Sequence, residues 1–211
     1  MAKDLMMPRM YNAQNPARSV FVPIRGLQYH LLEWGQPAPD QTSLFMVHGW
    51  MDVADSFQFV VDALRQGRHI LAPDWRGYGL TQVQTDNFWF PDYLADLDAL
   101  LEHFSPQAPV DLLGHSMGGN VAMLYGGVRP ERIRRLINLE GFGMAPTHAA
   151  QAPRRYAQWM DELRQLRRGE LGLKPYDSAE AVAERLRKNN PRLSRSEEHT
   201  SELQSHHDLV C

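Results

Sequence analysis

The sequence lacks the features that define several large classes of protein. It has one cysteine in 211 residues, Cys211 at the last position, which excludes a disulfide framework and a zinc site built from cysteines. No apolar run approaches the ~20 residues of a membrane-spanning helix, and residues 1–5 lack the apolar stretch of a signal peptide, so we expect a cytoplasmic protein with no membrane span. The net charge is only −3 and the basic residues are balanced by acids, so no nucleic-acid partner is expected. No cluster of side chains has metal-ligand spacing, and neither a metal nor a cofactor is expected.

The C-terminal residues 195–211 differ from the rest of the chain. Residues 195–205 closely resemble the translation of a DNA adapter used in short-read sequencing libraries, and residues 206–211 fit its continuation. We therefore interpret residues 195–211 as an artefact and expect the gene to continue past Ser194. A polar, disordered natural tail is the alternative. Because Cys211 lies in this stretch, residues 1–194 contain no cysteine.

Strand patterns alternate with amphipathic helical patterns over most of the chain, which predicts a parallel α/β sheet with right-handed crossovers. Residues 43–47 form a continuous apolar run, which is typical of a strand covered on both faces. Helices are expected from Asp55 or Ser56, which could cap the first of them, and from Pro91. The expected strands are residues 19–23, 27–34, 43–47, 69–72, 110–113 and 135–139, with a hairpin turn at Arg25-Gly26 between the first two.

The most informative stretch joins the strand at 110–113 to a helix through a very tight turn. Residues 114–118 (Gly-His-Ser-Met-Gly) carry the G-x-S-x-G pattern of a nucleophile elbow. On such a turn the backbone of Ser116 is strained so that its Oγ projects away from the sheet, and the two glycines let strand and helix pass closely. A glycine-rich turn with an incidental serine is the alternative, whereas neither a P-loop nor a dinucleotide-binding pattern fits these residues.

After Gly143 the pattern changes to helices with no strand between them, which indicates a cap or lid. Residues 156–166 have one apolar helical face, and a second helix opens at Asp177 with Glu180 in capping-box spacing. These changes divide the chain into an N-terminal extension (1–18), an α/β core (19–144), a helical lid segment (145–194) and the tail (195–211).

Three motifs together carry a resemblance to a known family. His48-Gly49 follows the third expected strand, residues 74–79 (Asp-Trp-Arg-Gly-Tyr-Gly) follow the fourth, and the elbow follows the fifth. In this order and spacing, residues 19–144 resemble the α/β-hydrolase superfamily. The resemblance implies an α/β fold with a mostly parallel sheet flanked by helices, here incomplete, with the first six strands and the start of a helical lid.

The resemblance also implies an active site at the elbow. Ser116 would be the nucleophile, and the backbone N–H groups of Trp50 and Met117 would form the oxyanion hole. The indole of Trp50 would either line the acyl pocket or simply pack.

Other polar residues near these motifs receive supporting roles. His48, Gly49 and His115 would flank the substrate pocket, with the two histidines packing or hydrogen-bonding rather than serving as general base. Asp74 and Arg76 would stabilise their own loop by local pairing. No partner is evident from sequence for three further histidines, His30, His69 and His103.

The chain departs from the family where the rest of the catalytic triad is expected. The family order is serine, acid, histidine, and the strands that normally precede the acid and the histidine are not recognisable here. Glu140, at the end of the sixth strand, is a candidate acid, with a pocket-side or structural role as the alternative. His148 follows Ser116 too closely, and the remaining histidines lie in the tail.

The sequence therefore predicts a truncated and inactive piece of a serine hydrolase. Its parent would cleave an ester, thioester or related acyl bond of a small molecule through an acyl-enzyme on Ser116. The alternatives are a non-catalytic binding protein on the same fold, and a C–C bond hydrolase or cofactor-free haloperoxidase. The sequence predicts neither the particular substrate nor the oligomeric state.

Overall fold

The computed structural model describes residues 11–64, 67–83, 88–143 and 146–170, with the single residues Asp177, Ser178, Ala181, Val182, Glu184, Arg185 and Lys188. The tail at 195–211 and most of the second lid helix lie outside the described residues. Asp177 is the expected cap of that helix. Instead, Ser178 Oγ accepts a hydrogen bond from Ala181 N–H at 3.2 Å, so Ser178 takes the capping role.

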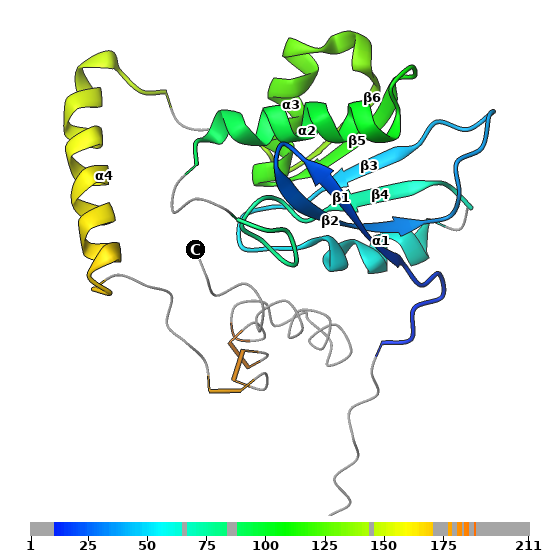
Figure 1. Cartoon of the computed structure of the whole chain (residues 1–211), viewed down its shortest axis with the longest axis horizontal. Helices are drawn as coiled ribbons and strands as arrows, with labels where there is room; N and C mark the ends of the chain where they lie inside the picture. The colour runs from blue at the N-terminus through cyan, green and yellow to red at the C-terminus, as the bar shows by residue number, and fades with distance from the viewer. Residues whose placement is uncertain are drawn as a thin grey trace, which may run out of the picture.

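Six strands form one sheet in the order β1-β2-β4-β3-β5-β6 (Figure 1). β1 and β2 run antiparallel, β2 pairs antiparallel with β4, and the four strands β3 to β6 are parallel, which confirms the expected mostly parallel sheet. The left-handed backbone of Arg25 (φ 47°) and Gly26 (φ 81°) closes the expected hairpin between the first two strands. The strands are β1 (Arg18–Ile24), β2 (Leu27–Trp34), β3 (Leu44–Val47), β4 (Ile70–Pro73), β5 (Val110–His115) and β6 (Ile133–Leu139).

Helices cover both faces of this sheet (Figure 1). The short 3-10 segment η1 (Ala54–Phe57) and α1 (Gln58–Ala63) lie on one face, and α2 (Phe90–Phe104) and α3 (Met117–Val128) lie on the other. The expectation that Asp55 or Ser56 caps the first helix is wrong, because the chain enters it through η1 and Ser56 Oγ instead donates to Val53 O at 2.9 Å. The short segment η2 (Pro130–Arg132) lies between α3 and β6, and β6 is followed by η3 (Ala149–Gln151) and the helix α4 (Ala152–Arg167).

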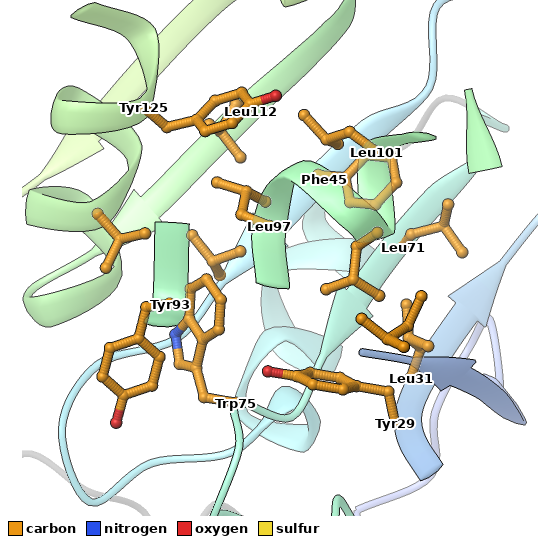
Figure 2. Packing of buried hydrophobic residues seen from close by; sticks show 14 of the residues in the cluster. Tyr29, Leu31, Phe45, Leu71, Trp75, Tyr93, Leu97, Leu101, Leu112 and Tyr125 are labelled. Atoms are coloured by element: carbon orange, nitrogen blue, oxygen red, sulfur yellow. The ribbon is translucent and has the colours of Figure 1, made fainter. Parts of the chain in front are cut away.

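Alternation along the central strands divides the core into two clusters. Phe45 of β3 belongs to the cluster under α2 and α3, and its neighbour Met46 belongs to the cluster under α1. Figure 2 shows the larger cluster, in which Leu97 and Leu101 of α2 pack over Leu71 and Phe45. This two-sided burial explains why β3 is apolar at every position.

The edge of the sheet at β6 carries several exposed apolar side chains. No described strand pairs with the outer side of β6, and several large apolar side chains there are exposed. They are Leu136, Ile137 and Leu139 of β6 with Met123, Leu124 and Val128 of α3. An apolar edge of this kind favours association with other polypeptide segments. Among the described residues, no helix is long and apolar enough to span a bilayer.

Candidate active site

The expected turn between β5 and α3 is present, and Ser116 lies at its apex. Ser116 has φ 51° and ψ −114°, a left-handed conformation that costs a non-glycine residue about 1–3 kcal/mol. The turn is tied to β6 because Ser116 N–H donates to Leu139 O at 2.9 Å. Ser116 is partly exposed as a residue, and its hydroxyl makes no hydrogen bond within the described part of the chain. The Oγ of Ser116 is therefore not held by a neighbouring group of the described structure.

The glycines on either side of the serine are required by close backbone contacts. A Cβ on Gly114 would lie 2.3 Å from Gly118 O, and a Cβ on Gly118 would lie 2.3 Å from Val47 O. Both distances are far below van der Waals contact, and the clashing atoms belong to the backbone. The start of α3 thus passes directly against both β5 and the end of β3.

We expect the substitution Gly118→Ala to lower the free energy of unfolding by about 3 kcal/mol, because the strand cannot move away from the new methyl group. Gly127→Ala is the matched control, since it adds the same group to the same helix where nothing lies within 4 Å. The control should raise stability by about 0.5 kcal/mol through helix propensity. Urea unfolding of both variants measures the difference; equal stabilities would contradict this account of the elbow.

The segment that follows β3 lies beside the elbow. A Cβ on Gly49 would be 3.1 Å from Ser116 Cβ and 3.3 Å from His115 Nδ1, so this loop passes next to the serine. Trp50, the expected donor of one oxyanion N–H, comes next. It is 63 % exposed, and the centroid of its ring lies 6.0 Å from the centroid of the Tyr78 ring. Met117, the expected source of the other N–H, is the first residue of α3. The two backbone groups therefore belong to the two segments that flank Ser116.

His48 is fully buried and both of its ring nitrogens are used in the loop. Its Nε2 accepts from Trp75 N–H at 2.9 Å, so the ring proton is on Nδ1, which donates to Gly49 O at 2.8 Å. In return the indole N–H of Trp75 donates to His48 O at 3.0 Å. Burial lowers the pKa of His48, which keeps the ring neutral in this arrangement. His48 thus fixes the loop after β3 to the loop after β4.

His115, directly before the nucleophile, faces an acid rather than the serine. Its Nδ1 lies 3.8 Å from Asp52 Oδ2, and its side chain is 46 % exposed. This carboxylate raises the pKa of His115 against the opposing effect of burial, and the charge of Glu140 raises it further. The ring is therefore charged over a wider pH range than an isolated histidine.

Glu140 sits in a turn that is held rigidly at the end of β6. It has φ 67°, again left-handed, and the residues around it close the turn: Gly141 N–H donates to Asn138 Oδ1 at 2.8 Å and Asn138 Nδ2 donates to Gly141 O at 2.6 Å. The pairing of β5 with β6 sets Leu139, the residue before Glu140, opposite His115. The carboxylate is exposed and has no hydrogen bond or ion pair among the described residues.

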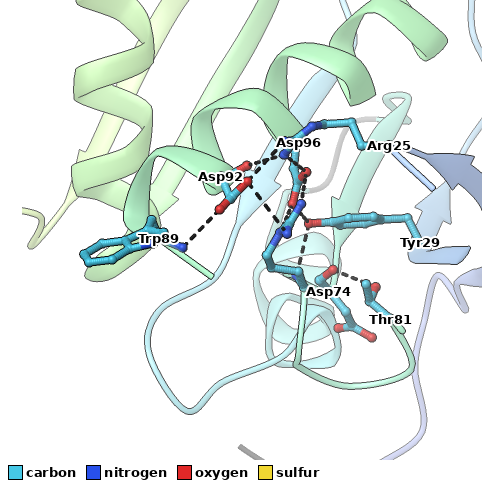
Figure 3. A network of polar contacts seen from close by, with 8 residues as sticks. Arg25, Tyr29, Asp74, Thr81, Trp89, Asp92 and Asp96 are labelled. Carbon is cyan, nitrogen blue, oxygen red and sulfur yellow. Dashed lines mark hydrogen bonds and ion pairs between the residues drawn. The ribbon is translucent and has the colours of Figure 1, made fainter. Parts of the chain in front are cut away.

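The loop after β4 is stabilised by a buried charge network (Figure 3). Asp74 pairs locally as expected, accepting from Leu80 N–H at 3.0 Å. The expectation of local pairing is wrong for Arg76, whose guanidinium bonds both oxygens of the fully buried Asp96 on α2, at 2.5 and 2.6 Å. Because a buried carboxylate requires paired donors, Arg76 ties the loop to α2 instead.

Two histidines that have no evident partner in the sequence have one in the structure. His30 Nδ1 lies 2.7 Å from Asp74 Oδ2 and its Nε2 lies 2.8 Å from Ser19 Oγ. His69 Nε2 lies 3.0 Å from Glu33 Oε1. The pairs with Asp74 and Glu33 join β2 to the residues that flank β4, which lie about 36–44 positions apart in sequence. No group of three or more histidine, cysteine, aspartate or glutamate side chains in the described ranges is placed to hold a metal ion.

The sheet order and the strained serine between β5 and α3 define an α/β protein with a nucleophile elbow. The chain belongs to the alpha/beta hydrolase fold family, whose pattern matches residues 42–200. It is 29 % identical over 161 residues to a "serine hydrolase-like protein" of Danio rerio, covering 70 % of this chain and 46 % of that protein.

Two further likenesses extend the comparison. The chain is 29 % identical to the 2-hydroxymuconate semialdehyde hydrolase of a Pseudomonas species over 129 residues, which is 57 % of this chain and 42 % of that protein. The thioesterase domain from the curacin biosynthetic pathway superposes with a TM-score of 0.73 and 25 % identity, covering 92 % of this chain and 68 % of that domain. The chain thus spans about half the length of the curated relatives it matches.

Proposed function

We propose that this chain is part of a serine hydrolase that cleaves an ester, thioester or related acyl bond of a small molecule through an acyl-enzyme on Ser116. The observation that carries the proposal is the strained, partly exposed serine between Gly114 and Gly118. At both glycine positions a Cβ would clash with backbone atoms. Strain at a position that the surrounding backbone fixes so closely is typical of a functional site. The family of the chain and the hydrolase names of its relatives give independent support for the class.

In this proposal the two flanking backbone groups bind the developing negative charge. Trp50 N–H and Met117 N–H donate to the oxygen of the tetrahedral intermediate, and the N-terminus of α3 adds its positive end. Gly49 permits this because any side chain there would press on Ser116 and His115. His48 supports the loop from behind and His115 borders the pocket without acting as the base.

Glu140 is the acid of the proposed triad. Its carboxylate has no hydrogen bond or ion pair among the described residues, and its turn is closed by the hydrogen bonds between Asn138 and Gly141. The turn follows β6, the strand that pairs with β5, and β5 leads directly to Ser116. The role of Glu140 is to orient a histidine that takes the proton of Ser116. We propose that this histidine lies outside the described residues, because His30, His48 and His69 are hydrogen-bonded elsewhere and His115 lies beside Asp52.

A C–C bond hydrolase is the second candidate, since one relative is named for hydrolysis of 2-hydroxymuconate semialdehyde. Such an enzyme would use the same serine on the same turn, so the discriminating observation is the substrate that is consumed. A non-catalytic binding protein does not require the left-handed serine, and the strain at Ser116 argues against it.

The test compares the 211-residue chain with protein made from the uninterrupted gene, using p-nitrophenyl acetate. We expect turnover by the longer protein and almost none by the chain, because an unassisted serine hydroxyl is a poor nucleophile near neutral pH. Brisk turnover by the chain, lost in Ser116→Ala, would mean that the base lies within residues 1–211. Turnover of 2-hydroxymuconate semialdehyde without turnover of the ester would favour the second candidate, and turnover of neither compound by either protein would contradict the proposal.

A further inference from the structure

The loop from β3 to η1 and the elbow are linked by one pair of charged side chains. Asp52 Oδ2 lies 3.8 Å from His115 Nδ1, with the two side chains 22 % and 46 % exposed. Asp52 stands two residues after Trp50, and His115 stands two residues before Met117. Each member of the pair therefore lies two residues from one of the backbone N–H groups assigned to the oxyanion hole.

Asp52 is itself fixed in place by the backbone that follows it. Its Oδ1 accepts from Val53 N–H at 2.9 Å, immediately before η1. Val53 and Ala54 are buried, and Ala54 N–H donates to Asp74 Oδ1 at 2.8 Å, so this end of the loop is anchored in the core. One carboxylate oxygen thus holds the loop end while the other reaches the elbow.

The short segment between these anchors is strained and otherwise loosely held. Met51 has φ 54°, a left-handed backbone that is unfavourable for a residue with a long side chain. The side chains of Trp50 and Met51 are both more than half exposed, so their own burial contributes little to the conformation. Contacts at the two ends of the segment must therefore maintain it.

We propose that Asp52 is a positioning residue that, through His115, holds the Gly49–Asp52 loop against the elbow and so sets the spacing of the two oxyanion donors. This inference rests on the proposed function for its catalytic consequence, but the positioning itself does not require turnover. The attraction acts between a carboxylate two residues before η1 and the imidazolium of His115 at the end of β5.

The link depends on pH in a defined direction. The ionisable groups that face His115 are Asp52, Glu140 and the buried, neutral His48. Although burial alone would raise the pKa of Asp52, His115 and Val53 N–H bring it below its ordinary value, while Asp52 raises the pKa of His115. The attraction is therefore complete between these two pKa values, and it is lost as the pH rises through the raised pKa of His115.

The test uses Asp52→Asn, which keeps an oxygen for Val53 N–H and removes the charge. Asp55→Asn is the matched control, because Asp55 is an exposed carboxylate on η1 that does not contact the elbow. In NMR spectra of the 211-residue chain, Asp52→Asn should lower the pKa of His115 and shift the Trp50 amide, and the control should do neither. An unchanged His115 pKa and Trp50 amide in Asp52→Asn would overturn the proposal.

Kinetics of the longer protein test the catalytic consequence. Asp52→Asn should lower kcat about tenfold with KM changed less than about twofold, since misplaced groups cost rate rather than ground-state binding. The ratio of wild-type to variant kcat should shrink as the pH rises through the pKa of His115. A displaced Trp50 amide with unchanged kcat would also overturn the proposal. If the wild type has no Ser116-dependent turnover, the proposed function fails, and the NMR result still decides whether Asp52 positions the loop.

Discussion

Replacing Ser116 with alanine in protein made from the uninterrupted gene is expected to lower kcat on a small activated ester by about 10⁶-fold. The loss should be this large because the hydroxyl forms the covalent bond of the acyl-enzyme, and no neighbouring group can take its place. The elbow should stay folded, since alanine also fits a partly exposed position and the glycine contacts are unchanged. Steady-state hydrolysis with active-site titration measures the effect.

Ser19→Ala is the informative control for that experiment. Ser19 Oγ lies 2.8 Å from His30 Nε2, and His30 Nδ1 lies 2.7 Å from Asp74, so the chain holds a second serine with a histidine and an acid in line. Ser19 is on the first strand, away from the elbow, and its replacement should leave kcat within about twofold of wild type. If Ser19→Ala lost activity and Ser116→Ala kept it, the assignment of the nucleophile would be wrong.

The second large effect is expected at Glu140. Glu140→Gln should lower kcat about 10³- to 10⁴-fold with little change in KM, because a neutral amide neither orients the catalytic histidine nor stabilises its charged form. Glu131→Gln is the control. Glu131 is an exposed glutamate on η2, the segment that directly precedes the edge strand β6. The measurement is kcat and KM for both variants in the longer protein. A loss at Glu140 no greater than at Glu131 would support the alternative, in which Glu140 is structural.

The sheet could be predicted from the sequence because its strands are encoded locally. The continuous apolar run of β3 shows that both faces are covered, and the G-x-S-x-G pattern marks a turn whose glycines are dictated by contacts at 2.3 Å. The six strands and their mostly parallel arrangement are confirmed. The strands and the elbow turn, which depend on residues close together in sequence, can therefore be predicted from sequence pattern.

The polar pairs could not be predicted, because they join residues far apart in sequence. Asp52 and His115 are separated by 63 positions, and Arg76 bonds Asp96 across a loop and a helix. Their geometry depends on how loops are placed at the end of the sheet, which residue spacing does not encode. The left-handed backbone of Glu140 likewise arises from the Asn138–Gly141 turn and not from any glycine pattern.

Peptide mapping by mass spectrometry shows directly whether Ser116 carries the acyl group. The longer protein is mixed with p-nitrophenyl acetate, quenched in acid during the first turnovers, digested and analysed for acetylated peptides. The account predicts one stoichiometric acetyl group on Ser116, absent when the protein carries Ser116→Ala. An acetyl group on another residue, or a protein that hydrolyses the ester without acylation of Ser116, would contradict it.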